Sequence, residues 1–377
     1  MDVTQASANF PLLVLRLRIT PKQVLKLPAA NKGNTLRGAF GGALRRLVCI
    51  PQCHDARQCP LDGVCPYRLI FEPSPPPGTD RLSKNQDTPR PFVFQPPLGS
   101  QATYNAGDAF DFSLTLLGKA VHYLPYFVLA FREVAREGIG LNRAPCELEQ
   151  VESLAPESAA RVPANEEECP LPLGGEGDPQ PALSSAGAGR VRGSLPLAPQ
   201  VIYNRQEDLF RQPRSLTLAD WVRPRLPEWT NANRRFTISF LTPTYLKFKE
   251  HAVLKPDFHH LFKRVRDRLN AVCTFFGPGP IDADFKALGE RAEQVRTVNA
   301  DVRWLERSRR SSKTGQRHEL SGFVGECIYE FPATESASCN LELLRWIICG
   351  ELLHAGRHTP WGNGQYMIST KGGTADA

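Results

Sequence analysis

The sequence predicts an α+β protein in which amphipathic helices pack on antiparallel sheets. Two observations favour this class. Residues Phe110–Leu117, and the second half of Leu12–Thr20, alternate apolar with polar residues, as half-buried antiparallel strands do. Residues Val121–Arg136 and Asp257–Phe275 instead repeat apolar residues at helical spacing.

In the first half of the chain, the predicted elements follow the order strand, helix, strand, strand, helix, strand. The first helix begins at Asn34 or Thr35, either of which can cap a helix. Besides Leu12–Thr20, strands are predicted at Tyr67–Pro73, Pro91–Pro97, Phe110–Leu117 and Cys146–Val151. With Tyr67–Pro73 as one additional strand, this is the order of the ferredoxin-like fold.

The second half restarts with a strand at Arg235–Leu241 and adds a hairpin with a basic tip. Asp301–Trp304 and Gly322–Phe331 are its predicted strands. Between them, the stretch Arg307–Arg317 contains five cations and no carboxylate: Arg307, Arg309, Arg310, Lys313 and Arg317. Such clustering favours contact with a polyanion, and the alternative is a solvated hairpin.

Composition divides the chain into three parts. We predict an N-terminal domain over residues 1–153 and a C-terminal domain over 199–377. Between them, residues 154–198 form an acidic, Pro- and Gly-rich linker or insert, since Glu147–Asp178 contains nine acidic residues and one basic one.

Composition also limits the class of protein. The net charge of +7 is a modest basic excess. No apolar run reaches the ~20 residues of a membrane span. Met1–Asn9 has neither a basic segment nor an apolar core of a signal peptide, so we expect a cytoplasmic protein. Ten cysteines in such a protein indicate reduced thiols or a metal site rather than disulfides.

Four of these cysteines fall in one short stretch, residues 49–65. Cys49, Cys53, Cys59 and Cys65 could hold a structural Zn²⁺, although their gaps are looser than those of common zinc motifs. Buried thiols without a metal and an iron–sulfur cluster are the alternatives, and His54 could replace one ligand.

Near the C-terminus, an apolar helix leads into a glycine-rich loop. The helix is predicted to end near Ala355, with Gly356 as its cap. Arg357, His358 and Trp361 follow. Glycines let the backbone approach a ligand closely, and histidines can move protons near neutral pH.

Several stretches, taken in order, resemble a known family. They are Thr35–Cys49, Cys65–Pro73, Ser321–Glu326 with the arginines before it, and Ala355–Tyr366. Together they resemble the CRISPR-associated endoribonucleases of the RAMP superfamily (the sixth Cas family), which process precursor crRNA. The branch with a cysteine-rich insertion after the first helix is the most similar.

The resemblance implies two tandem ferredoxin-like (RRM-like) domains that face each other, and a glycine-rich loop, here Gly356 to Gly364. It implies CRISPR repeat RNA or crRNA as a partner, with other Cas proteins of an effector or adaptation complex. It also implies cleavage without a metal or other cofactor. In that reaction a ribose 2′-hydroxyl attacks the adjacent phosphate, leaving a 2′,3′-cyclic phosphate and a 5′-hydroxyl.

The proton transfers of this reaction call for histidines and its charged transition state for a cation. Many family members carry a catalytic histidine on or next to the first helix, but Asn34–Cys49 has none and the nearest is His54. We therefore predict His358 and His354 as catalytic, with Arg37 as a charge partner. The predicted RNA-binding residues are the five cations of the basic run together with Gly356, Arg357, Gly362 and Gly364.

Two other functions compete with an endoribonuclease. One is a RAMP subunit that binds crRNA without cutting it, which the missing helix histidine favours. The other is a general RNA-binding module, which predicts aromatic residues for base stacking on the first strand, where Leu12–Thr20 has none.

Overall fold

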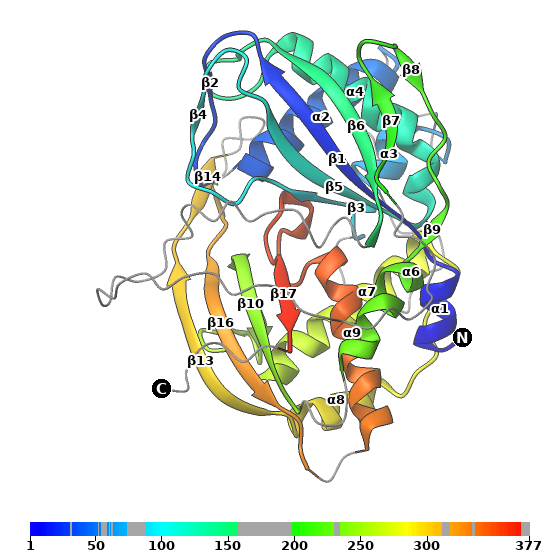
Figure 1. Ribbon diagram of the computed structural model, residues 1–377, viewed down its shortest axis with the longest axis vertical. Helices are drawn as coiled ribbons and strands as arrows, with labels where there is room; N and C mark the ends of the chain where they lie inside the picture. The colour runs from blue at the N-terminus through cyan, green and yellow to red at the C-terminus, as the bar shows by residue number, and fades with distance from the viewer. Residues whose placement is uncertain are drawn as a thin grey trace, which may run out of the picture.

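Two antiparallel sheets with the same strand order make up the two halves of the molecule (Figure 1). This computed structural model describes residues 1–30, 32–51, 53, 59, 61, 63–73, 88–156, 198–229, 234–310, 317–333 and 336–370.

In the first sheet the central strand order is β3–β5–β1–β6. These strands are β1 (Pro11–Pro21), β3 (Phe92–Gln95), β5 (Phe110–Leu117) and β6 (Cys146–Leu154). Helices α2 (Lys32–Val48) and α4 (Leu124–Glu137) pack on one face of the sheet. Phe40 of α2 stacks on Phe127 and Phe131 of α4, with ring centroids 4.8 and 5.5 Å apart.

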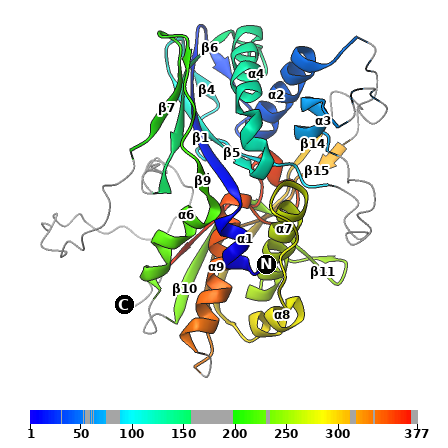
Figure 2. The ribbon, with the colours of Figure 1, turned by 90° about the vertical axis from the view of Figure 1, so that its right-hand side faces the viewer.

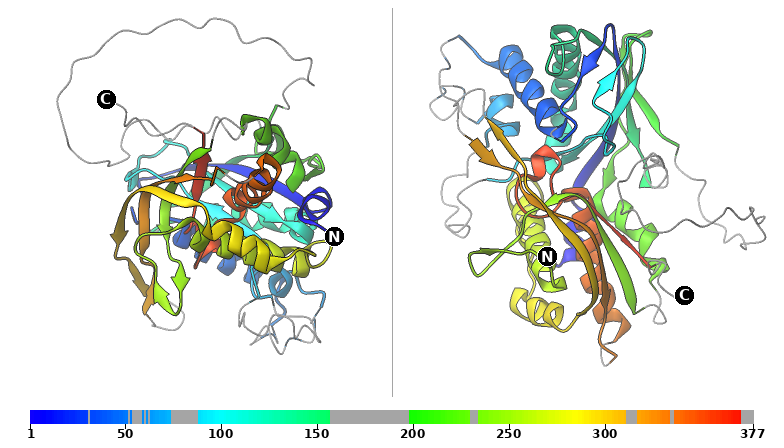
Figure 3. Two further views of the ribbon diagram at one scale, coloured as in Figure 1. Left: turned by 90° about the horizontal axis from the view of Figure 1, so that it is seen from below. Right: turned by 90° about the vertical axis from the view of Figure 1, so that its left-hand side faces the viewer.

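The second sheet repeats this plan with the order β13–β16–β10–β17. Its strands are β10 (Arg235–Thr244), β13 (Arg296–Leu305), β16 (Gly322–Glu330) and β17 (Tyr366–Ser369), covered by α7 (Phe258–Phe276) and α9 (Ala337–Leu353). Seen from below, both helices lie on one face of this sheet (Figure 3, left). Each half is thus a βαββαβ unit, and the predicted pair of ferredoxin-like domains is confirmed.

Shorter elements surround these two units. They are α1 (Val3–Ala8), α3 (Pro66–Ile70), α6 (Leu218–Val222), α8 (Phe285–Glu293), the 3₁₀ helices η3 (Gly118–Tyr123), η4 (Arg223–Glu228) and η5 (Thr359–Trp361), and the strands β2 (Leu25–Lys26), β4 (Thr103–Tyr104), β7 (Gln200–Asn204), β8 (Leu209–Phe210), β9 (Leu216–Thr217), β11 (Lys247–Phe248), β12 (His251–Ala252), β14 (Ser308–Arg310) and β15 (Arg317–Glu319).

Strand β1 belongs to both hydrophobic cores. Leu12 and Val14 are buried in the core of the second domain, whereas Leu13 and Leu15 are buried in the core of the first. Helix α1, just before β1, packs with the second domain through Val3 and Ala6 (Figure 2). The two domains are therefore tied together at the start of the chain.

The structure places the domain boundary differently from the sequence. Strand β7 pairs with β6, and β9 pairs with β1, so residues 200–217 extend the first sheet. The predicted boundary at residue 199 therefore does not separate the two sheets. Most of the predicted acidic linker lies outside the described residues.

Two local predictions are wrong. Residues 66–70 form helix α3 rather than a strand, and Pro66 occupies its first turn, where a missing N–H costs nothing. Helix α2 begins at Lys32, before the predicted caps Asn34 and Thr35. Within the described part of the chain, no helix is both long and apolar enough to cross a membrane.

Candidate functional site

The glycine-rich loop begins where α9 ends. The helix cap is His354, with φ 58°, and not Gly356 as predicted. A Cβ on Gly356, which has φ +82°, would lie 2.3 Å from the carbonyl oxygen of Tyr245. One on Gly364 would lie 1.8 Å from that of Ala355. These glycines therefore let the loop close on itself and on the end of β10.

The loop uses much of its own hydrogen-bonding capacity. The N–H of Arg357 donates to Tyr245, that of Gly362 to Thr359, and that of Gly364 to Pro243, at 3.2, 3.0 and 3.0 Å. These amides are therefore occupied within the protein. Contact with a ligand from this loop falls mainly to its side chains.

The middle of the loop packs closely against the first domain. A Cβ on Gly33, in the first turn of α2, would lie 2.1 Å from the carbonyl oxygen of Trp361. A Cβ on Gly362 would lie 2.9 Å from that of Phe94 in β3. In Figure 1 the loop is the red segment between the two sheets. We call this contact between the α2 start and η5 the seam.

His354 lies behind the seam and is fully buried. Its Nδ1 donates to the carbonyl of Asn363 at 3.1 Å, and its Nε2 accepts from the Gln95 amide at 3.4 Å. Burial lowers the pKa of His354 to about 3, with a smaller contribution from the Arg268 cation, so the ring is neutral. Both nitrogens of the His354 ring are therefore engaged within the protein.

His358 and Arg37 meet at the indole of Trp361. The His358 ring stacks on it at 4.5 Å with an interplanar angle of 7°, and the ring is half-buried. The Arg37 guanidinium lies 5.5 Å from the same indole and 4.3 Å from Phe71. We call Arg37, His358 and Trp361 the Trp361 cluster. In this cluster the His358 imidazole of the second domain and the Arg37 guanidinium of the first domain lie near the same Trp361 indole ring.

Arg357, by contrast, is exposed. Its guanidinium lies 4.7 Å from the ring of Tyr245, so the cation is held beside the loop without a carboxylate among the described residues. This leaves its charge available to an anionic ligand.

The basic hairpin extends the β13–β16 pair toward the first domain. β14 pairs with β15, with Arg309 opposite His318 and Arg310 opposite Arg317 (Figure 3, right). The Arg307 guanidinium donates to the carbonyl of Ala30 at 2.9 Å, and burial lowers its pKa. Arg307 therefore links the hairpin to the segment before α2. Lys313 and the side chains of Arg309, Arg310 and Arg317 lie outside the described residues.

The four predicted metal ligands follow α2. Cys53, Cys59 and Cys65 are buried, and Cys49 is half-buried. Burial, together with the neighbouring thiols of Cys53 and Cys65, raises the pKa of Cys49 to about 11. The pKa of Cys53 is raised by burial and by the adjacent Cys59. The thiols thus influence one another's ionisation, although, among these described residues, no three of their sulfurs lie within 4.8 Å of one another. A cation would relieve the cost of ionising them.

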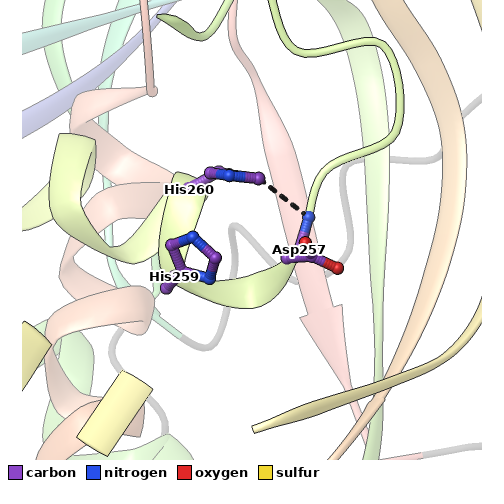
Figure 4. A group of neighbouring side chains, drawn as sticks. All are labelled: Asp257, His259 and His260. Atoms are coloured by element: carbon purple, nitrogen blue, oxygen red, sulfur yellow. Dashed lines mark hydrogen bonds between the residues drawn. The ribbon is translucent and has the colours of Figure 1, made fainter. Parts of the chain in front are cut away.

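Asp257, His259 and His260 are, among the described residues, the one set of three metal-ligating groups within 4.8 Å of one another (Figure 4). They are the start of α7. His260 Nδ1 accepts the Asp257 N–H at 3.1 Å, and the Asp257 carboxylate accepts from Thr297 at 2.9 Å and from the α7 backbone. Burial lowers the pKa of His260 to about 4. Asp257 and His260 thus already serve as a helix cap, so we assign this set no metal.

Comparison with protein families identifies the second half of the chain. The family model described as CRISPR-associated endoribonuclease Cas6 matches residues 238–366, from β10 through the glycine-rich loop. This part of the C-terminal domain is thus similar to the Cas6 family. A second family model, described only as an N-terminal domain, matches residues 10–172. The resemblance to Cas6 endoribonucleases is therefore confirmed, and the cysteine-rich branch stays a prediction.

Solved Cas6 structures share the fold. A product complex of one Cas6 protein (TTHB231) is 16% identical, covering 95% of this chain and 100% of its own, with a TM-score of 0.51. The Thermus thermophilus Cas6 of that designation is 15% identical over 96% and 100%, with a TM-score of 0.47. A partial Cas6-RT-Cas1–Cas2 complex is 11% identical over 96% of this chain and 46% of its own, with a TM-score of 0.50. This chain thus spans less than half of that last protein. No curated protein matches the sequence.

The seam yields a stability prediction with a control in the same helix. Gly33→Ala places a methyl group against the Trp361 carbonyl, so we expect the free energy of unfolding to fall by roughly 1–3 kcal/mol. A Cβ on Gly38 would meet nothing within 4 Å, so Gly38→Ala should stabilise α2 by about 1 kcal/mol. Urea unfolding measures both, and equal shifts in the two variants would contradict the contact.

Proposed function

We propose that this chain is an endoribonuclease that cleaves precursor crRNA within CRISPR repeats. The observation that carries the proposal is the Trp361 cluster. His358 and Trp361 lie in the part of the chain that matches Cas6, and Arg37 comes from α2. The matched family consists of RNA-cleaving enzymes, and the mechanism below is our proposal for this chain.

In the proposed reaction the RNA supplies its own nucleophile. His358 takes the proton of a ribose 2′-hydroxyl, and the 2′-oxygen attacks the adjacent phosphate. Positioned proton transfer of this kind contributes roughly 10²–10⁴-fold in rate. Arg37 and the exposed Arg357 stabilise the charge that develops on the phosphate. The products are a 2′,3′-cyclic phosphate and a 5′-hydroxyl, and no metal-bound water is required.

The proposed partners follow from the same family. Cas6 proteins have been solved as product complexes and in a Cas6-RT-Cas1–Cas2 complex. We propose that this chain binds CRISPR repeat RNA, keeps the cleaved crRNA, and acts with other Cas proteins.

A second function is favoured by one specific observation. Helix α2 contains no histidine, so its N-terminal turns lack the proton-transfer group that the resemblance implies. The alternative is therefore a RAMP subunit that binds crRNA without cutting it. The cleavage assay below separates the two functions.

The cleavage prediction concerns His358. Single-turnover cleavage of a repeat RNA should persist in EDTA, and His358→Ala should lower its rate by ~10²-fold or more, because the general base is lost. RNA affinity should change little. His251→Ala, an exposed histidine on β12, is the matched control and should cleave normally.

Two further results would change the proposed mechanism. Normal cutting of an RNA with 2′-deoxyribose before the cut would rule out 2′-hydroxyl attack. A wild-type rate in the His354→Ala/His358→Ala double variant would mean that another residue is the general base. His54 would then be the next candidate, and it lies outside the described residues. By itself, His354→Ala should mainly lower stability.

The binding prediction concerns the basic hairpin. Replacing Arg309 and Arg310 with Ala should weaken RNA binding and reduce the slope of log affinity against log salt. The reduction should be about 0.7–0.9 for each phosphate that the variant no longer neutralises. Arg307→Ala should also weaken binding and, through Ala30, loosen the link to the first domain.

The matched control removes the same charge elsewhere. Arg235 and Arg296 are paired with Glu330 at the end of the second sheet that lies away from the hairpin, so replacing both with Ala should leave the salt slope almost unchanged. If the hairpin variant and the control have the same affinity and slope, the hairpin is not part of the RNA-binding surface.

For the cysteines we propose a structural Zn²⁺ held by Cys49, Cys53, Cys59 and Cys65. Four thiolates suit tetrahedral Zn²⁺. Burial and the neighbouring thiols raise the pKa values of Cys49 and Cys53, and coordination to the cation would favour their ionised forms. Bound there, it would fold the segment after α2 and take no part in cleavage.

The metal prediction is tested by elemental analysis. Protein purified without chelator should hold about one Zn²⁺ per chain, and Cys65→Ser should lose it together with stability but not the chemistry of cleavage. Cys339→Ser, at a half-buried cysteine in α9, is the control and should keep the ion. Iron with sulfide would indicate a cluster instead, and metal-free protein would end the proposal.

A further inference from the structure

Lys32 is a buried cation that the proposed mechanism does not use. It is the first residue of α2, and its relative exposure is 3%. Its ammonium donates to the carbonyl of Gly99, and none of the ion pairs among the described residues includes it. An ammonium group has three donors, so one carbonyl leaves much of its capacity unused.

This position is unfavourable for a lysine that serves only stability. Lysines are almost never buried without a partner. The amino end of a helix also carries a positive dipole, which repels a cation and attracts an anion. Burial lowers the pKa of Lys32, which makes its proton easier to give up. Groups held at such a cost are concentrated at functional sites.

Lys32 lies at the seam. A Cβ on its neighbour Gly33 would lie 2.1 Å from the Trp361 carbonyl oxygen and 3.2 Å from Pro96. Pro96 also borders Gly362, and Gly99, the partner of Lys32, follows three residues later. Lys32 therefore flanks the same loop as His358 and comes from the opposite domain.

The segment that holds the Gly99 carbonyl against Lys32 lies at the surface. Leu98 is 45% exposed and Ser100 is exposed, so Gly99 belongs to a surface segment. A phosphate oxygen accepts a charge-assisted hydrogen bond that is stronger than one to a carbonyl. An RNA phosphate at the seam could therefore take the ammonium from Gly99.

We propose that Lys32 is the proton donor to the leaving 5′-oxygen. This rests on the proposed function and fills the one role left open there. The 2′-oxygen loses its proton to His358 and forms a bond to phosphorus. The bond from phosphorus to the 5′-oxygen breaks, and that oxygen takes a proton from the Lys32 ammonium. A neutral amine and an imidazolium remain, and solvent restores both.

The test uses a repeat RNA in which sulfur replaces the bridging 5′-oxygen at the cut. A thiolate is a weaker base than an alkoxide and leaves without a proton donor. Lys32→Met should slow the oxygen substrate by ~10²-fold or more and cleave the sulfur substrate at close to the wild-type rate. Lys32→Arg keeps the charge but holds its proton too tightly, so it should behave like Lys32→Met. His358→Ala should be slow on both substrates.

A second measurement needs no variant. With wild-type protein, the rate on the oxygen substrate should fall at high pH as Lys32 loses its proton, and this fall should be absent with the sulfur substrate. Equal slowing of both substrates by Lys32→Met, a wild-type rate on the oxygen substrate, or identical pH profiles would each overturn the role of Lys32. Failure of wild-type protein to cut either RNA would instead overturn the proposed function.

Discussion

The contact between the backbones of α2 and η5 is the constraint on which the rest of the site depends. At Gly33 even a Cβ would collide with the Trp361 carbonyl, and at Gly362 one would press on β3. The two domains can approach this closely only because glycine has no side chain. Thr242 then fixes the loop from the other side by donating to the Gly362 carbonyl at 2.8 Å. The loop is thus held by both domains, and the orientation of His358 depends on both.

This constraint explains how the charges are distributed. On the outer face of the first sheet, cations are neutralised by neighbouring strands, as Arg16 is by Glu152 and Arg18 by Asp111. At the seam, Arg37 and Arg357 lie against aromatic rings, and Arg357 is exposed with no carboxylate partner among the described residues. A polyanion is therefore favoured at the seam and along the basic hairpin above it rather than on the first sheet.

Much of the fold was predictable because its signals are local. The period of Phe110–Leu117 and the apolar face of α7 specify their elements within a single window. The strand predicted at Tyr67–Pro73 was wrong because a short apolar run does not distinguish a strand from a helix. Pro66 favours the helix, because proline is well accommodated in a first helical turn. Strand β7 was assigned to the wrong half because pairing with β6 is a long-range contact.

The site was predictable only in part for the same reason. The sequence places His354 at the end of a helix and His358 in the loop that follows. Only tertiary packing shows that Gln95 contacts the His354 ring while Trp361 stacks on the His358 ring. Lys32 has no local pattern that marks it, because its burial depends on Gly99 and the surrounding loop.

The central claim, that RNA is cut at the seam, is tested most directly by photo-crosslinking from a 4-thiouridine placed beside a 2′-deoxy cleavage position. Crosslinks should map to residues 30–40 and 355–366, and crosslinks confined to the outer face of the first sheet, residues 146–154, would contradict it.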